Sequence, residues 1–255
     1  MILIRRPWTR QPQGTDYGIN PQWAARGCQA VALRGRVLGK STRIPGVLTA
    51  TPRGVGPSYL QSSTGVDLGV PCTATTWSLL LVVRLVSSSG YDYAFSGTGG
   101  GSSLSLADSD FSPSRLLVYV GGKRHVGSAM GIVVGETAVI AYRANGAGST
   151  FSFFKNGEKA TDSSTGTWAG VGNWAIRDIV GDARHQEIVP LIAIFPSVAL
   201  SDVELRALTL QPYSVISSLV QIIPGQAASS GLPTLTALTA SNITTSGWRA
   251  TLTAA

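Results

Sequence analysis

Two tryptophans flank a glycine-rich loop in the second half of the chain, and their spacing is the clearest indication of a ligand site. The loop reads TWAGVGNW, with Trp168 and Trp174 near its ends and Asn173 beside the second ring. An exposed indole can stack on a sugar ring, and an amide can hydrogen-bond to sugar hydroxyl groups. These three residues form the candidate glycan-binding site. The alternative is that both indoles pack in the core or at its rim, because tryptophan is largely buried in folded proteins.

The residue patterns of catalysis are weak. No Gly-x-Ser-x-Gly sequence is present, and only His125 and His185 are available as a general base. His125 follows Lys-Arg and is expected in a solvated turn. Glycosidases need two carboxylates about 5–10 Å apart across the scissile bond, whereas the 13 acidic residues here are isolated in the sequence. We therefore predict that the chain is not an enzyme, and no catalytic residue is assigned.

Metal binding is also weakly supported. The nearest approach to a calcium site is Asp108-x-Asp110, with Asp92 or Asp182 as partners. Calcium takes about six to eight oxygen ligands, and an ordinary Ser-Asp turn accounts for the pattern with fewer assumptions. No His/Cys spacing suits zinc. We expect no metal and no cofactor.

Composition predicts a folded, β-rich protein. Of the 255 residues, 44% are hydrophobic, 13% are charged and 30 are glycine, which suits short strands joined by turns. No apolar run approaches the roughly 18 residues of a membrane span, and the first residues do not resemble a signal peptide. Cys28 and Cys72 are predicted to be buried thiols, with a single bridge as the alternative. We expect synthesis in a reducing cytoplasm.

Two unbroken apolar segments predict strands that are buried on both faces, namely 75–86 and 187–195. Asn156-Gly157 predicts a type I′ hairpin, because both positions of that turn need positive φ. About a dozen short strands at even spacing indicate an all-β sandwich of two sheets. The other expected strands are 29–33, 59–68, 91–96, 103–107, 115–121, 123–129, 150–155, 158–162 and 173–180.

One short helix is predicted after the second apolar strand. Ser201 and Glu204 have the spacing of a capping box, in which the hydroxyl and the carboxylate bind each other's backbone amides. Leu200 and Leu205 are placed to form the hydrophobic staple around this cap. Pro212 then prevents continuation of the helix.

This order of residues resembles the end of the laminin-G-like, concanavalin-A-like jelly-roll domain of tailed-bacteriophage virion proteins. The resemblance covers roughly residues 22–213 and implies that 25–213 form such a sandwich. The opening run RRPWTRQPQG is also similar to the starts of phage proteins that carry this domain. The residues that carry the helix resemblance are Leu200, Ser201, Asp202, Glu204, Leu205, Leu208, Gln211, Pro212 and Tyr213.

The first 24 residues are predicted to form an extended basic arm. Residues 1–53 contain nine of the 20 basic residues and one acid, hence a net charge of +8, while the rest of the chain is close to neutral. This asymmetry indicates an acidic partner, and an acidic protein surface is favoured over nucleic acid because no nucleic-acid-binding motif is present. A simply solvated arm is the alternative. The candidate docking residues are Arg5, Arg6, Trp8, Arg10 and Tyr17, although Trp8 and Tyr17 could equally fold back on their own domain.

The composition changes after Tyr213. Residues 214–231 are predicted to be a linker, and 232–255 alternate leucine with threonine before Trp248. The second segment looks like the start of an immunoglobulin-like or fibronectin-type-III-like module. About two dozen residues cannot close such a sandwich. Either the native chain continues past Ala255, or the tail donates strands to a neighbouring subunit.

The phage resemblance implies a structural protein on the outside of the virion, as a tail fibre, a baseplate or adaptor component, or a capsid decoration protein. Its partners would be other virion proteins, and a homo-oligomer, in particular a trimer, is expected. Assembly would take place in the bacterial host cytoplasm. The alternative function is a carbohydrate-binding module for host attachment through a surface glycan. An enzyme acting on glycans is disfavoured.

Overall fold

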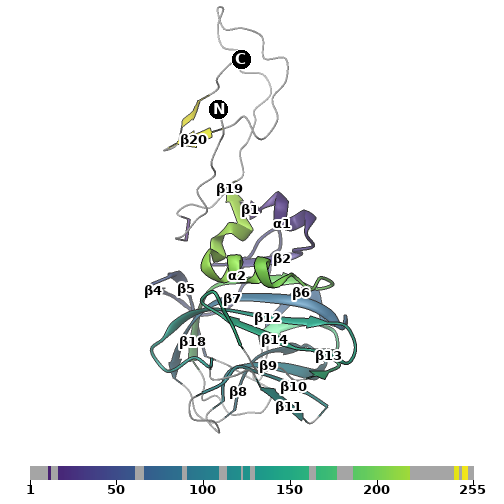
Figure 1. Cartoon of the computed structure of the whole chain (residues 1–255). Coiled ribbons are helices and arrows are strands. Elements are labelled where there is room, and N and C mark those ends of the chain that lie inside the picture. Colours follow the sequence, from purple (N-terminus) through teal and green to yellow (C-terminus); the bar gives the residue numbers. More distant parts are fainter. Residues whose placement is uncertain are drawn as a thin grey trace, which may run out of the picture. The chain divides into compact units, whose positions relative to one another are not determined.

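The computed structural model describes residues 11–12, 17–60, 66–87, 91–108, 114–121, 123–126, 130–160, 165–176, 186–218, 244–246 and 249–251. The chain forms two compact units (Figure 1). Trp8–Ser218 make the larger unit, and Met1–Pro7 with Leu219–Ala255 make the smaller one. The described part of the smaller unit is an antiparallel pair, β20 (Thr244–Ser246) and β21 (Arg249–Thr251).

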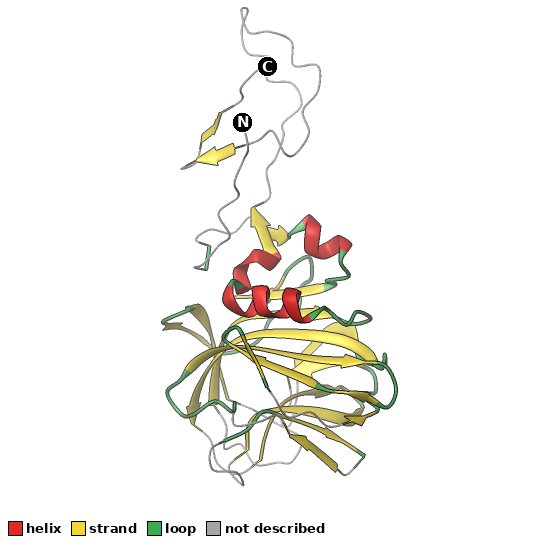
Figure 2. Cartoon of the chain, in the orientation of Figure 1, coloured by secondary structure: helices red, strands yellow, loops and turns green. Residues whose placement is uncertain are grey.

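The larger unit is a sandwich of two antiparallel sheets (Figure 2). In the first sheet the strands run β15-β14-β12-β7-β18-β2-β3, with β5 on β18 and β4 on β5. In the second they run β11-β10-β9-β8-β17-β6. The prediction of an all-β sandwich with one short C-terminal helix is confirmed.

The bounds of the strands follow the chain closely. The first sheet contains β2 (Ala30–Leu33), β3 (Arg36–Val37), β4 (Val47–Thr51), β5 (Gly54–Leu60), β7 (Thr76–Ser87), β12 (Thr137–Asn145), β14 (Ser152–Lys155), β15 (Glu158–Lys159) and β18 (Gln186–Phe195). The second contains β6 (Val66–Pro71), β8 (Tyr91–Gly97), β9 (Gly100–Asp108), β10 (Leu117–Val120), β11 (Lys123–Val126) and β17 (Asn173–Ile176). A separate pair is formed by β13 (Ser149–Thr150) and β16 (Thr165–Gly166).

The strands β7 and β18 are buried on both faces, as their unbroken apolar sequences predict. Side chains alternate along a strand, so neighbouring residues enter different cores. In β7, Leu79 and Leu81 belong to the core between the two sheets, whereas Leu80 and Val82 belong to a second core on the outer face of the first sheet. A strand with this pattern needs a covering layer on each side.

The second core is covered by short helices and by a pair of strands that joins the two ends of the unit (Figure 2). The covering elements are α1 (Pro21–Ala25), α2 (Asp202–Leu210), the 3-10 helix η1 (Pro212–Val215), β1 (Tyr17–Ile19) and β19 (Ile216–Ser218). The ring of Trp23 packs edge-on against Phe195 with centroids 6.0 Å apart. Residues 17–24, which the sequence assigned to an extended arm, therefore include a strand and most of a helix that pack on the sandwich.

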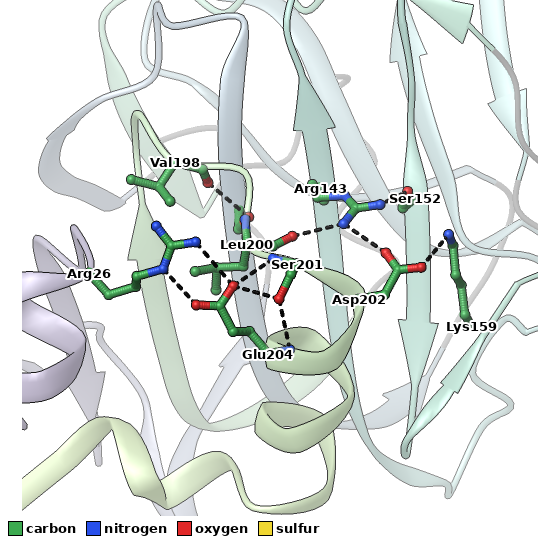
Figure 3. A network of polar contacts seen from close by, with 10 residues as sticks. Arg26, Arg143, Ser152, Lys159, Val198, Leu200, Ser201, Asp202 and Glu204 are labelled. Atoms are coloured by element: carbon green, nitrogen blue, oxygen red, sulfur yellow. Dashed lines mark hydrogen bonds and ion pairs between the residues drawn. The ribbon is translucent and has the colours of Figure 1, made fainter.

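The capping box of α2 is present as predicted (Figure 3). The Glu204 amide donates to Ser201 Oγ over 3.3 Å, and the Ser201 amide donates to Glu204 Oε2 over 2.7 Å. Arg26 adds a two-point ion pair, with Nε 2.6 Å from Oε1 and Nη2 3.1 Å from Oε2 of Glu204. These contacts hold the loop after α1 against the start of α2. They raise the pKa of Arg26 and lower the pKa of Glu204 to about 2.

Asp202 ties the same helix to the first sheet (Figure 3). Its Oδ1 lies 2.8 Å from Arg143 Nη1 on β12, and its Oδ2 lies 2.7 Å from Lys159 Nζ on β15. The pKa of Asp202 is lowered, chiefly by the Lys159 hydrogen bond. The helix and its charged residues thus complete the architecture and expose no reactive group.

Three smaller predictions can also be compared with the structure. Asn156 and Gly157 have φ of 50° and 93°, and Lys155 pairs with Glu158 across them, as expected for a type I′ hairpin. Cys28 and Cys72 are free and buried. In the described part of the chain no helix is long and apolar enough to cross a membrane.

Candidate functional site

The two tryptophans of the predicted glycan site are core residues. Trp168 is 1% exposed and Trp174 is 0% exposed, and both rings contact Trp77 at centroid distances of 4.8 and 5.1 Å. Trp168 also donates its indole N–H to the Cys72 carbonyl over 2.7 Å. Neither ring offers a face for a sugar to stack on. The prediction of sugar stacking on these rings is corrected, and the alternative of core packing is what the structure shows.

The loop over these rings is closed by backbone contacts with the turn between β8 and β9. The Gly99 amide donates to the Val171 carbonyl over 2.9 Å, and the Thr98 amide donates to the Asn173 carbonyl over 2.8 Å. A Cβ on Gly101 would lie 2.0 Å from the carbonyl oxygen of Ala169. The glycines of both segments therefore serve close backbone approach, which also explains why the indoles lie beneath backbone and away from water.

A polar rim is left at the surface of this closed loop, and Asn173 belongs to it. Its Nδ2 donates to Asp67 Oδ2 over 3.0 Å, and Asp67 Oδ1 accepts from the Gly69 amide over 2.6 Å. Thr98 and Val171 lie beside this pair, both exposed, with Val171 at 53%. We call Asp67, Thr98, Val171 and Asn173 the rim.

Lys40 supports the rim from the first sheet. It lies in the turn after β3, and its Nζ donates to the carbonyls of Leu68 and Gly69 on β6, at 3.2 and 2.5 Å. Gly69 has a φ of 66°, a conformation that glycine adopts readily. The rim thus presents a carboxylate, an amide, a hydroxyl and a small apolar side chain on a turn whose backbone is fixed.

Sequence reasoning found Asn173 and missed the other rim residues. Asn173 and Asp67 are 106 residues apart, and only the pairing of β17 with β6 brings them together. A local signal did exist, because an Asp two residues before a Gly is typical of a side-chain-capped turn. That signal identifies the turn at Asp67 but gives no information about its partner.

The predicted docking arm is described only in part. Arg5, Arg6, Trp8 and Arg10 lie outside the described residues. Tyr17 lies in β1, which pairs with β19, and it packs against the outer core. For Tyr17 the structure therefore shows the fold-back alternative.

The remaining chemical candidates do not assemble into a site. His125 is 8% exposed on β11, with its ring 5.3 Å from that of Phe151, so its assignment to a solvated turn is wrong. Burial, with a smaller effect of Lys123, lowers its pKa. Among the described residues no group of three His, Cys, Asp or Glu could hold a metal. Asp110, Asp182 and His185 lie outside those residues, as do the side chains of Asp92 and Asp108.

Comparison with protein-family models gives no match, and comparison with curated proteins gives none either. Among solved structures, the chain is similar to Trypanosoma rangeli sialidase in complex with sialic acid, with a TM-score of 0.53 and 12% identity. That match covers 73% of this chain and 33% of the sialidase, so the chain spans about a third of the length of that enzyme. Likeness at this identity shows the fold alone.

Two smaller proteins also match. One is domain 4 of AbnA, an extracellular arabinanase from Geobacillus stearothermophilus, in complex with arabinotriose; its TM-score is 0.46 at 14% identity, over 71% of this chain and 87% of that one. The other is the CBM40 of Ruminococcus gnavus IT-sialidase bound to α2,3 sialyllactose; its TM-score is 0.45 at 16% identity, over 60% and 96%. The structural neighbours are thus β-sandwich proteins of sialidases and carbohydrate-binding domains.

Proposed function

We propose that the sandwich is a non-catalytic carbohydrate-binding module and that the rim is its sugar-contacting surface. The observation that carries this proposal is the exposed pair of Asp67 and Asn173. A carboxylate accepts hydrogen bonds from sugar hydroxyls, while an amide both donates and accepts, so one pair can bind two adjacent hydroxyl groups. Val171 provides an apolar contact for the C–H groups of the ring.

The turn under the rim favours binding of a rigid, weak kind. Asp67 is held by the Gly69 amide and Gly69 is held by Lys40, so little side-chain freedom is lost on binding. Without a stacking ring the surface is shallow, and affinities on the order of millimolar are expected for a single site. We propose no hydrolysis, because Asp67 is the one carboxylate of the rim as defined above and a glycosidase needs two.

The test is binding of the full chain to a glycan array, followed by affinity measurement with the glycans that bind. Asp67→Asn keeps the oxygen that accepts from Gly69 but removes the charge, and Asn173→Ala removes the amide. Each is expected to weaken binding at least tenfold. The matched controls are Glu158→Gln and Gln22→Ala, both exposed positions away from the rim. Absence of any glycan binding, or equal binding by all four variants, would reject the proposal.

A second proposal concerns where the module is carried. Residues 200–213 and the opening arm resemble tailed-phage virion proteins, and the first 53 residues hold most of the positive charge. We propose that the module is displayed on the outside of such a particle and docked by its arm. The expected trimer and the host attachment role stay predictions. If particles incorporate a chain without residues 1–10 normally, the docking role of the arm is wrong.

A further inference from the structure

The strand β4 lies at an open edge of the first sheet. It pairs with β5 from Val47↔Ser58 to Thr51↔Gly54, and no described strand pairs with its other side. Leu48 stands opposite Pro57, which has no amide hydrogen, so this pair is of the kind whose amide groups point away from the partner. By alternation, the N–H and C=O of Leu48 and Ala50 face the open edge. Such an edge is a template for another extended segment.

The side chains of β4 do not protect this edge. Val47 is 78% exposed and Leu48 is 55% exposed, on opposite faces of the strand. Edge strands are commonly guarded by charged residues or proline, and the sequence VLTAT contains neither. Figure 1 shows β4 and β5 at the margin of the sandwich. The strand therefore combines free backbone groups with apolar surface.

Basic residues stand at both ends of β4. Arg36 and Arg43 form an isolated antiparallel bridge just before the strand, and Arg53 lies in the turn after it. Like charges directly opposite each other are destabilising. In the described part of the chain these three side chains form no ion pair, whereas Arg26, Arg143, Lys155 and Lys159 do. No acidic residue occurs between Asp16 and Asp67, so the sequence supplies no local carboxylate.

We propose that β4 binds an extended acidic segment of a partner protein as an added strand. The partner's backbone pairs with Leu48 and Ala50, its apolar side chains cover Val47 and Leu48, and its carboxylates pair with the arginines at the two ends. This interaction is independent of sugar binding at the rim and goes beyond the proposed function.

Other occupants fit less well. A second copy of β4, paired antiparallel, would bring the arginines of two chains together. A nucleic acid would use the arginines, but β4 offers no aromatic side chain for base stacking and the free strand edge would stay unpaired. The combination of an open edge with flanking arginines therefore favours an acidic polypeptide.

The probe is a fluorescein-labelled synthetic peptide in which Glu alternates with Thr, added to the full chain and followed by fluorescence anisotropy. A peptide with Lys in place of Glu is the charge control. Binding of the Glu peptide, and none of the Lys peptide, is expected. The double variant Arg36→Gln/Arg43→Gln should bind the Glu peptide at least tenfold more weakly. Arg206→Gln, which neutralises an exposed arginine of α2, should bind it like the unmodified chain.

Strand pairing is tested separately from charge. Ala50→Pro removes an amide at the open edge and takes no bond from the β4–β5 ladder, and it should weaken binding. A Glu peptide N-methylated on alternate residues makes the same test without altering the protein. The double variant Val133→Thr/Val134→Thr, which changes another exposed apolar pair, should have no effect.

Three results would overturn the proposal. They are failure of the Glu peptide to bind, equal binding after the arginine substitutions, and equal binding of the N-methylated peptide. Tighter binding of an oligonucleotide or a sulfated glycan through Arg36 and Arg43, unaffected by Ala50→Pro, would also overturn it, because the arginines would then bind a polyanion without strand pairing.

Discussion

Trp168 and Trp174 stack on each other, with ring centroids 5.0 Å apart and planes inclined by 21°. Together with Trp77 they fill one part of the core between the two sheets. The stacking that a sugar would need is thus already made within the protein. What the loop offers to a ligand is its outer edge, where Asn173 meets Asp67.

Replacing a ring of this cluster should destabilise the fold. Trp174→Ala is expected to lower the free energy of unfolding by about 3–5 kcal/mol, because it leaves a large cavity in a closed core. Urea denaturation measures this change. Asn173→Ala, one residue away and half-buried, should cost about 0.5–1.5 kcal/mol, the net value of one hydrogen bond. A stable Trp174→Ala protein that has lost glycan binding would show that the ring is a ligand contact.

The cap of α2 should make a measurable contribution to stability. Ser201→Ala removes the oxygen that accepts from the Glu204 amide, and a loss of about 1 kcal/mol in the free energy of unfolding is expected. Chemical denaturation of the full chain gives the value. Ser41→Ala, an exposed serine in the turn after β3, is the matched control and should be neutral. Equal stability of the two variants would mean that the cap is redundant with the Arg26–Glu204 pair.

The ion pair between Arg26 and Glu204 predicts a specific dependence on pH. Its pairing with Arg26 and Ser201 lowers the pKa of Glu204 to about 2, below the value of the unfolded chain. A carboxylate with a lowered pKa contributes stability fully above its unfolded pKa, and the contribution is lost as the pH falls through the folded pKa. The stability difference between the unmodified chain and Glu204→Gln should be constant near neutral pH and should shrink between about pH 4.5 and 2. A difference that persists unchanged at pH 2 would contradict this assignment.

Both thiols should be unreactive in the folded protein. Burial raises the pKa of Cys28 to about 12 and that of Cys72 to about 11, so little thiolate is present at pH 8. A colorimetric thiol reagent is expected to react slowly with the native chain and to detect two thiols rapidly after denaturation in guanidinium. Rapid reaction of the native protein would show that one site opens readily.

The elements that could be predicted from the sequence are those that local patterns specify. The apolar run of β7 requires a covered strand, and Ser201 with Glu204 requires a helix start, wherever these segments lie. Asn156-Gly157 likewise determines its turn because few other residues tolerate positive φ twice in succession.

The candidate site could not be predicted in this way. The pattern TWAGVGNW is compatible with exposed and with buried rings, and the choice depends on whether another backbone closes over them. That backbone is the β8–β9 turn, some 70 residues earlier, whose position depends on strand order in the second sheet. The bridge of Arg36 with Arg43 also arises from a fold-dependent pairing. Helix α1 was missed because its five residues are too few for a helical period to show.

The central claim, sugar binding at the rim, is tested most directly by a residue-resolved titration. The full chain labelled with 15N is titrated with a glycan that binds it on an array, and backbone and side-chain amide shifts are recorded. The account predicts saturable shifts at Gly69, Thr98, Val171 and the Asn173 side-chain amide, which disappear in Asn173→Ala and persist in Gln22→Ala. Saturable shifts confined to other residues, with the rim unchanged, would contradict it.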